Sequence, residues 1–261
     1  MSENSDNHIR FNSTNMVVLC KEFKHLEKNP VLASQDMKAA RRFISSLESH
    51  CEELAAFRPE VSLHDTTEIF TIDNFFSEEE CQALIPVVRT ELSSGGVTNN
   101  GNTDANIRTS QIHAFYEHTP ARQKICDYLG LHPNYGEPMV GQIYGKDQEF
   151  KLHCDYFEDS RPLEFNHYAR QQGGQRTWTF QVYLTDVEEG GETVFPRLEL
   201  SVKPKRGMAL VWNNLLPDGM PNRDTNHAST PVIKGEKIIV TQWFRAGVWS
   251  SPSTTKPTEV E

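Results

Sequence analysis

The sequence has little of what membrane proteins and nucleic-acid-binding proteins need. Hydrophobic residues make up 37% of its 261 residues, and no apolar run approaches the ~20 residues that a membrane-spanning helix requires. Basic residues are in deficit: 26 lysines and arginines stand against 36 aspartates and glutamates, giving a formal net charge of -10. Such a chain repels a phosphate backbone. We therefore expect no membrane and no nucleic acid as partner, and favour a peptide or a small molecule.

Cysteine is scarce and is not clustered. The five cysteines are scattered and form no CxxC pair, which argues against a disulfide framework and a structural zinc site. The polar start of the sequence also lacks a signal-peptide core, because its apolar run from Met16 to Cys20 is shorter than the about 7 to 15 residues such a core takes. These absences predict a reducing compartment, the cytoplasm.

Helical patterns occupy the first part of the chain. Apolar residues at helical spacing predict helices between Leu19 and Leu54, packing faces rather than binding sites. Further on, Ser77 and Glu80 form a capping box that begins a helix. Another short helix is expected between Thr119 and Gly130. We expect a helical extension over residues 1–62, a main domain over 63–250 and a disordered tail over 251–261.

From about residue 139 the pattern changes to that of strands. Short segments of alternating or continuous apolar residues are separated by Gly, Pro and Asp: "MVGQIY", "EFKLHCDYF", "RTWTFQVYLTDV", "GMALVWN" and "EKIIVTQWF". Many short strands without long helices between them predict an antiparallel sandwich or a double-sheet jelly roll. Residues 93–110, rich in Gly, Asn and Thr, are expected to form a long, mobile loop of the kind that is often functional.

The segment "KLHCDYF" contains a candidate metal site. On a strand, His153 and Asp155 point to the same face, because side chains alternate with period two, while Cys154 points away. An HxD pattern alone is more often a pair of polar residues on an exposed face, so a third ligand is required. His167 lies in a polar loop, whereas His227 directly precedes a strand-like segment. His227 is therefore the better third ligand.

Two chemistries are open to such a ligand set. Two histidines and one carboxylate suit a non-haem Fe(II) site with free positions for substrate and oxygen. A zinc hydrolase is the competing interpretation, and it requires a separate general base near the metal. An oxygenase instead requires a cation that holds an anionic cosubstrate. Lys237 stands ten residues after His227, at the head of a predicted strand, where it can face the same cavity.

With these residues in place, the sequence resembles the 2-oxoglutarate- and Fe(II)-dependent dioxygenases, and among them the prolyl 4-hydroxylases. The resemblance covers roughly residues 65 to 247. The long block ending in "YLTDVEEGGETVFP" is far more specific to that branch than HxD alone. The motifs that carry the resemblance are "RTS" (108–110), "HCDYF" (153–157), "GGQRTWTFQVYLTDVEEGGETVFP" (173–196), "VKPKRGMALVW" (202–212) and "HASTPVIKGEKIIVTQWF" (227–244).

The resemblance implies a fold and a set of site residues. It implies a mainly β protein with N-terminal helices and a double-stranded β-helix (jelly-roll) core, in which His153, Asp155 and His227 bind Fe(II). It also implies that Lys237 pairs with the distal carboxylate of 2-oxoglutarate. A buried dianion needs such partners. The remaining cosubstrate positions implied by the resemblance are Tyr144, Thr179 and Trp243, although Tyr144 and Trp243 also suit plain core aromatics.

Substrate positions follow from the same resemblance. Arg108 and Ser110 match residues that face a peptide substrate, and the loop before them matches a lid. Glu137 and Arg245 are weaker candidates, and Arg245 stands where relatives often carry histidine. The segment "YGKDQEF" departs from the relatives' Tyr-x-x-Gly-Gln-x-Tyr, with Asp147 and Phe150 in place of glycine and tyrosine. A different turn and the loss of one hydroxyl are expected there.

The activity implied is hydroxylation of a C–H bond, most simply of peptidyl proline, with O2 as oxidant and succinate and CO2 as co-products. Ascorbate is implied as the reductant that restores oxidised iron. Fold-level likeness does not decide the substrate. A hydroxylase of a free amino acid or a natural-product precursor, and a catalytically silent module that binds proline-rich peptides, are therefore kept as alternatives. A silent module is expected to have lost a ligand or the lysine, and this sequence retains them all.

Overall fold

A computed structural model gives the fold of the chain. It describes residues 61–64, 66–90, 92–94, 97–99, 102–104, 107–115, 119–158, 172–216 and 219–249. The helices expected between Leu19 and Leu54, the tail over 251–261 and His167 all lie outside these residues. Within the described residues, none of the helices is both long enough and apolar enough to span a membrane.

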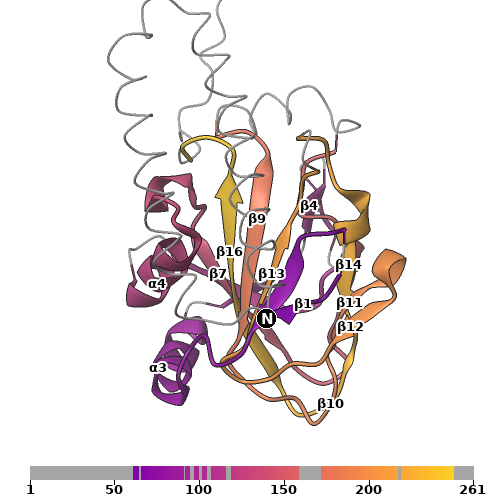
Figure 1. Ribbon diagram of the computed structural model, residues 1–261. Helices are drawn as coiled ribbons and strands as arrows, with labels where there is room; N and C mark the ends of the chain where they lie inside the picture. The colour runs from indigo at the N-terminus through magenta and orange to yellow at the C-terminus, as the bar shows by residue number, and fades with distance from the viewer. Residues whose placement is uncertain are drawn as a thin grey trace, which may run out of the picture.

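Two antiparallel sheets form the body of the protein (Figure 1). The larger sheet has eight strands in the order β1-β2-β13-β9-β16-β7-β6-β3, and the smaller has four in the order β12-β11-β14-β8. Two further pairs, β10-β15 and β4-β5, complete the pairing. The strands are β1 Val61–Ser62, β2 Ile69–Ile72, β3 Ser93–Ser94, β4 Val97–Asn99, β5 Asn102–Asp104, β6 Gln111–Phe115, β7 Met139–Tyr144, β8 Phe150–His153, β9 Arg176–Tyr183, β10 Glu189–Gly190, β11 Thr193–Phe195, β12 Leu200–Val202, β13 Ala209–Asn213, β14 His227–Ser229, β15 Val232–Lys234 and β16 Lys237–Arg245.

Alternation along the central strands separates two buried layers. On β9, Trp178, Phe180 and Val182 join the core cluster beneath the helices, whereas Tyr183 joins the cluster that contains Phe195 of the smaller sheet. Successive side chains of a strand point to opposite faces, so the polar residues between those apolar ones face the space between the sheets. The five predicted segments from "MVGQIY" to "EKIIVTQWF" each contain one of these strands.

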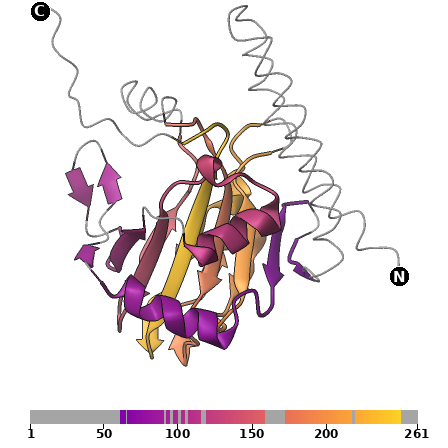
Figure 2. The ribbon, with the colours of Figure 1, turned by 90° about the vertical axis from the view of Figure 1, so that its left-hand side faces the viewer.

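Two helices cover the outer face of the larger sheet (Figure 2). α3 (Glu78–Val88) begins at the expected capping box, in which the Ser77 hydroxyl accepts from the Glu80 amide at 3.2 Å and Glu80 accepts from the Ser77 amide at 2.7 Å. α4 (Pro120–Leu129) is capped by Thr119 and ends at Gly130 in the left-handed conformation. Both predicted helices are therefore confirmed. Short 3-10 turns lie at Pro133–Tyr135, Pro196–Leu198 and Arg223–Thr225.

The segment from residue 93 to 110 differs from the loop that its composition predicts. β3 pairs with β6, and β4 pairs with β5 as a hairpin that stands apart from the two sheets (Figure 2). The sequence carries a signal for this hairpin, because Asn100-Gly101 lies between the two strands and Asn-Gly is a preferred hairpin turn. The expectation of a plain loop was wrong in this respect.

Candidate metal and cosubstrate site

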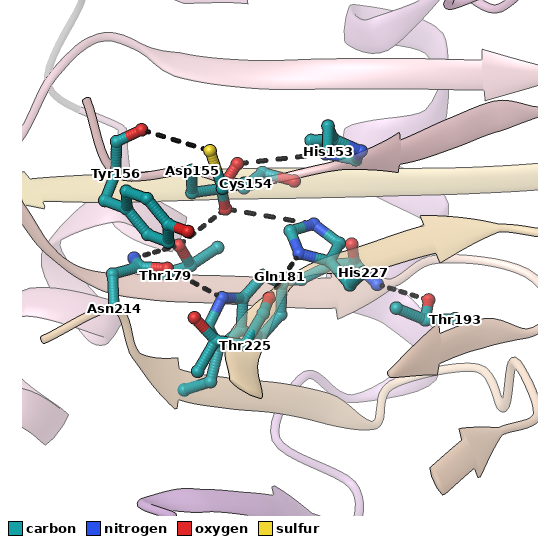
Figure 3. Close-up of polar contacts among 12 residues, drawn as sticks. His153, Cys154, Asp155, Tyr156, Thr179, Gln181, Thr193, Asn214, Thr225 and His227 are labelled. Carbon is teal, nitrogen blue, oxygen red and sulfur yellow. Dashed lines mark hydrogen bonds and ion pairs between the residues drawn. The ribbon is translucent and has the colours of Figure 1, made fainter. Parts of the chain in front are cut away.

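The three predicted ligands meet between the two sheets. His153 ends β8, His227 begins β14, and the two residues are direct partners across the β8-β14 pair. Asp155 lies two residues beyond the end of β8, so strand alternation alone does not place it; the chain leaves the sheet at Cys154 and turns the carboxylate back (Figure 3). One possible ligand atom from each residue lies within 4.8 Å of the others. The structure therefore brings together the three residues that the sequence singled out.

Backbone hydrogen bonds fix both imidazole rings in the orientation that a metal ligand needs. Nδ1 of His153 lies 2.8 Å from the carbonyl oxygen of Lys151, and Nδ1 of His227 lies 3.0 Å from that of Thr225. A carbonyl only accepts, so each Nδ1 carries the proton and each Nε2 keeps its lone pair. Burial lowers the pKa of His227 and, with the neighbouring His227, lowers that of His153 well below its usual range. Both rings are thus neutral, and each can offer the lone pair of its Nε2 to a metal ion.

Asp155 is held as a carboxylate. Burial alone raises its pKa, but the Arg176 guanidinium and the Trp243 N–H act against this effect, and the pKa of the carboxyl lies below its usual range. Its Oδ1 lies 3.9 Å from Nε2 of His153, and its Oδ2 lies 4.0 Å from Nε2 of His227. The charge of this ligand is therefore retained across the whole physiological pH range.

A hydrogen-bond chain behind Asp155 includes Thr179. The Thr179 hydroxyl donates to Oδ2 of Asp155 at 2.7 Å and accepts from the Asn214 side-chain amide at 2.8 Å (Figure 3). Asn214 in turn accepts from the Trp212 indole at 3.1 Å. Thr179 is fully buried and does not line the cavity around the three ligands. Its contacts are those of a residue that orients Asp155, and its role at the cosubstrate stays a prediction.

Lys237 is a buried cation without a carboxylate partner among the described residues. It is 1% exposed, and its ammonium group donates to the Ser229 hydroxyl at 2.8 Å and, at 3.4 Å, to the Thr193 hydroxyl. Burial lowers its pKa to about 7. An unpaired buried charge is costly, so this end of the cavity is built to receive an anion.

The two aromatic residues expected at the cosubstrate do line the same cavity. Tyr144 is the direct strand partner of Lys237, and its hydroxyl donates to the Gln142 side chain at 2.6 Å. The Trp243 indole N–H is buried beside Asp155 and helps to lower the pKa of that carboxyl. Both side chains thus have a polar atom beside the cavity, which a purely apolar core role does not use.

The four residues expected at the substrate occupy two places. Arg108 lies over Phe150, with its guanidinium carbon 4.0 Å from the ring centroid, and Ser110 is buried with its hydroxyl beside that of Tyr144, whose pKa it lowers. Glu137 and Arg245 lie elsewhere, in one ion-pair cluster with Arg176. Arg245 is therefore paired with other groups of the protein, and it is not a free cation at the substrate position.

The two departures from the relatives' motif have different outcomes. Asp147 takes a φ of 64°, the left-handed conformation that aspartate tolerates, so the turn survives the loss of glycine. Phe150 stacks on the His153 ring, with centroids 3.5 Å apart and an interplanar angle of 14°. The hydroxyl of a tyrosine is therefore absent from the cavity wall, as expected, while the ring braces a candidate ligand.

Several residues of the site were missed from sequence. Thr193, Gln181 and Ser229 line the cavity beside Lys237, and the Thr193 hydroxyl lies 2.8 Å from the Tyr183 hydroxyl. Arg176 forms a two-point ion pair with Glu137. The signal for Thr193 was its place inside the specific block "GGETVFP", but only the packing of β11 against β16 shows which threonine approaches the lysine.

The three candidate ligands fit one kind of metal centre. Two neutral imidazoles and one carboxylate on a β scaffold are the ligands of a non-haem Fe(II) site with open positions. The unpaired ammonium of Lys237 fits the distal carboxylate of an anionic cosubstrate. None of the described side chains near the three ligands adds a spare glutamate or histidine as the general base of a zinc hydrolase.

Comparisons with known proteins agree with this chemistry. Residues 139–245 match the family model described as "2OG-Fe(II) oxygenase superfamily". The chain is 32% identical over 206 residues to "Probable prolyl 4-hydroxylase 3" of Arabidopsis thaliana, covering 68% of this chain and 69% of that protein. It is 30% identical over 220 residues to "Probable prolyl 4-hydroxylase 10" of the same plant, covering 74% and 71%.

A solved structure is similar over most of its own length. The viral collagen prolyl hydroxylase of Paramecium Bursaria Chlorella virus-1, in its 2OG complex, superimposes with a TM-score of 0.52 and 28% sequence identity. The match covers 67% of this chain and 94% of the viral protein.

Proposed function

Because this chain belongs to the 2OG-Fe(II) oxygenase superfamily, in its prolyl 4-hydroxylase branch, we propose that it hydroxylates a C–H bond of peptidyl proline. The enzyme is an Fe(II)- and 2-oxoglutarate-dependent dioxygenase with a jelly-roll core, so succinate and CO2 are the co-products. The observation that carries the proposal is the position of an unpaired, buried Lys237 in the cavity that His153, Asp155 and His227 also line.

The candidate ligands divide the work of the site. Nε2 of His153, Nε2 of His227 and the Asp155 carboxylate would hold Fe(II), since each presents a free lone pair to the same space. Thr179 keeps the Asp155 carboxylate oriented through its 2.7 Å hydrogen bond. When bound, iron and 2-oxoglutarate supply the oxidising chemistry, while the protein orients the substrate and excludes water.

The cosubstrate end of the site is assigned to the residues around Lys237. Lys237 would bind the distal carboxylate of 2-oxoglutarate, with the Thr193 and Ser229 hydroxyls beside it. Tyr144 and Trp243 offer further polar atoms to the same cavity. Thr193 takes the place that the sequence had suggested for Thr179, because Thr193 lines the cavity and Thr179 does not.

The peptide substrate is inferred from the relatives. The similar Arabidopsis proteins are named probable prolyl 4-hydroxylases and the similar viral protein is named a collagen prolyl hydroxylase. A proline-containing peptide or protein is therefore the first substrate to test, with ascorbate as the reductant that maintains Fe(II). Arg108 and Ser110 are the proposed substrate contacts at one side of the cavity.

The experiment is release of succinate by the purified protein with Fe(II), 2-oxoglutarate, O2 and ascorbate, compared across proline-rich peptides and free proline. Substrate-linked succinate and a mass gain of one oxygen on a peptide support the proposal. Stimulation by free proline alone indicates the alternative, a hydroxylase of a free amino acid. Binding of peptides without any succinate release indicates a silent binding module.

His153→Ala and Asp155→Ala are the matched variants for the metal. Each is expected to abolish peptide-linked succinate release, because an open Fe(II) site with only two protein ligands is incomplete. Full activity in both variants contradicts the ligand assignment.

A further inference from the structure

Two arginines share one carboxylate at an edge of the site. Nε and Nη2 of Arg176 donate to the two oxygens of Glu137 at 2.6 and 2.7 Å. Nε of Arg245 lies 2.5 Å from the Oε1 of the same glutamate. Glu137 is 8% and Arg245 is 6% exposed. A single carboxylate neutralises one guanidinium, so this buried cluster keeps one positive charge.

A third arginine, Arg108, packs against a second aromatic residue of the cavity, Phe150. The guanidinium carbon of Arg108 lies 4.0 Å from the ring centroid of Phe150, and that of Arg176 lies 4.2 Å from the ring of Trp243. Phe150 and Trp243 both line the cavity that contains the candidate metal ligands. Among the described residues Arg108 makes no ion pair, and its buried Nε has no hydrogen-bond partner. Each aromatic wall therefore carries a guanidinium.

The charges of the centre itself cancel once it is loaded. Fe(II) and Lys237 together carry three positive charges, and 2-oxoglutarate and Asp155 together carry three negative charges. The two histidines are neutral as ligands, because Nδ1 of each carries its one proton toward a backbone carbonyl and Nε2 keeps its lone pair. What remains around the loaded centre is three guanidiniums and the carboxylates of Glu137 and Glu192, a surplus of one positive charge. This surplus is local, since the whole chain carries a formal charge of -10.

From this surplus we infer that the acceptor substrate carries a carboxylate near the carbon that is hydroxylated. The inference rests on the proposed function and narrows its substrate class. A guanidinium binds a carboxylate with two parallel hydrogen bonds, and it is the preferred partner for a carboxylate at partly buried sites. Nη1 of Arg176 is not used in its pair with Glu137, and the Arg176 side chain is 20% exposed. The carboxylate is either an acidic side chain beside proline or the free carboxyl end of the substrate.

Equilibrium binding to the full-length protein separates these sources without turnover. The protein is loaded anaerobically with Mn(II) and 2-oxoglutarate, and peptides are titrated by calorimetry. The side-chain arm compares acetyl-Gly-Glu-Pro-Glu-Gly-amide with its Gln counterpart. The terminal arm compares acetyl-Gly-Gly-Pro with its amide. We expect at least tenfold tighter binding of the charged member in one arm, and that arm identifies the source.

Arg245→Gln and Arg245→Lys are the matched variants. Arg245→Gln leaves Arg176 and Glu137 as a neutral pair, so it should weaken binding of the charged peptide about tenfold more than binding of the neutral peptide. Arg245→Lys keeps the charge and should keep the preference. A general loss of structure in a variant would weaken binding of the charged and the neutral peptide equally. The affinity for 2-oxoglutarate shows whether the metal and cosubstrate site is intact.

The outcomes also separate this inference from the proposed function. Equal affinity of charged and neutral peptides in both arms, with succinate release intact, overturns the inference alone. Absence of both binding and succinate release with every peptide overturns the proposed function and the inference with it. A preference that survives in Arg245→Gln and in Arg108→Gln also overturns the inference, because the charge surplus is then not its source.

Discussion

At the scale of single residues, the orientation of the Asp155 carboxylate depends on one hydroxyl. The Thr179 hydroxyl donates a hydrogen bond to Asp155 at 2.7 Å and accepts from Asn214, while the Trp243 indole also acts on the Asp155 carboxyl and lowers its pKa. Groups that hold a metal ligand in place typically contribute a factor of about 10 to 100 in metal affinity. Thr179 therefore acts on the metal through Asp155, and its removal should be visible in metal binding itself.

We predict that Thr179→Val lowers the affinity for Mn(II) or Co(II) about tenfold or more, while Thr179→Ser, which keeps the hydroxyl, stays near wild type. Anaerobic calorimetric titration measures both. Equal metal affinity in the valine and serine variants contradicts the role given to this hydroxyl. Weaker binding of 2-oxoglutarate with unchanged metal affinity returns Thr179 to the cosubstrate role first suggested by the sequence.

Lys237 leads to a prediction about cosubstrate binding. Lys237→Met keeps the length and apolar volume of the side chain but removes the charge that faces the cavity. The affinity for 2-oxoglutarate should fall at least about 100-fold, because a carboxylate then enters a buried site without its cation. Metal affinity should change little, because the ammonium contacts Ser229 and Thr193, not the three ligands. An unchanged Michaelis constant for 2-oxoglutarate rules out the assignment.

The same substitution predicts a pH-dependent change in stability. Burial lowers the pKa of Lys237 from 10.5 in its ordinary environment to about 7. Between these values the unfolded chain binds more protons than the folded one, so the lysine destabilises the cosubstrate-free protein fully below pH 7, and this penalty disappears as the pH rises toward 10.5. Lys237→Met should raise the free energy of unfolding at pH 6 on the order of 2 kcal/mol.

Urea denaturation from pH 6 to pH 10 without 2-oxoglutarate measures this effect. The advantage of Lys237→Met should shrink steadily above pH 7. Lys234→Met, at an exposed lysine on β15, is the control and should stay within about 0.5 kcal/mol of wild type at each pH. An advantage that does not change with pH has a source other than the titration of Lys237.

At the scale of elements, the pairing of β10 with β15 depends on a glycine. Gly190 has a φ of 77°, and a Cβ at this position would meet the backbone, including the amide nitrogen of Ile233 at 2.8 Å and the carbonyl oxygen of Pro231. A residue with a side chain is strained in this conformation, and the neighbouring strand leaves no room to relieve the strain. Gly190, the first glycine of "EEGGETVFP", is therefore required by the backbone conformation and not by the reaction.

We predict that Gly190→Ala lowers the free energy of unfolding by about 2 kcal/mol or more. Gly145→Ala is the matched control, because a Cβ there meets nothing closer than 3.6 Å and the backbone φ is not positive. It should change stability by less than about 1 kcal/mol. Thermal or urea denaturation of the two variants decides, and equal stability contradicts the steric account.

The elements also show what the sequence can and cannot predict. β7, β9, β13 and β16 follow from the period of their apolar residues, and both helices follow from their caps, since these signals are local. His153, Asp155 and His227 were found because spacing and resemblance agree on them. The choice of Thr193 over Thr179 depends instead on which strands face each other. That relation arises only from the packing of two sheets.

The ion-pair cluster had no local signal for the same reason. Glu137, Arg176 and Arg245 are far apart in the sequence and meet only because β9 and β16 are neighbours in the larger sheet. The hairpin of β4 and β5 is a different case. Its Asn-Gly turn was readable, but the polar composition of the segment outweighed it.

At the scale of the whole molecule, the limits of the catalytic domain are open to test. All the described strands of both sheets and both described helices lie between residues 61 and 249, and the domain limits expected from sequence, 63–250, remain a prediction. We predict that a chain of residues 61–249 unfolds cooperatively and binds metal and 2-oxoglutarate within about threefold of the full chain. Tenfold weaker binding or a non-cooperative transition shows that residues outside 61–249 contribute to the domain.

The strand order has a consequence for how the protein is made. β14 lies between β11 and β8, and β16 lies between β9 and β7, yet both come late in the sequence, at His227–Ser229 and Lys237–Arg245. Until these strands leave the ribosome, their neighbours are unpaired edges, which promote aggregation. A nascent chain that stops before residue 227 has neither a third metal ligand nor a closed sheet. The complete set of candidate iron ligands therefore exists only after β14 has been made.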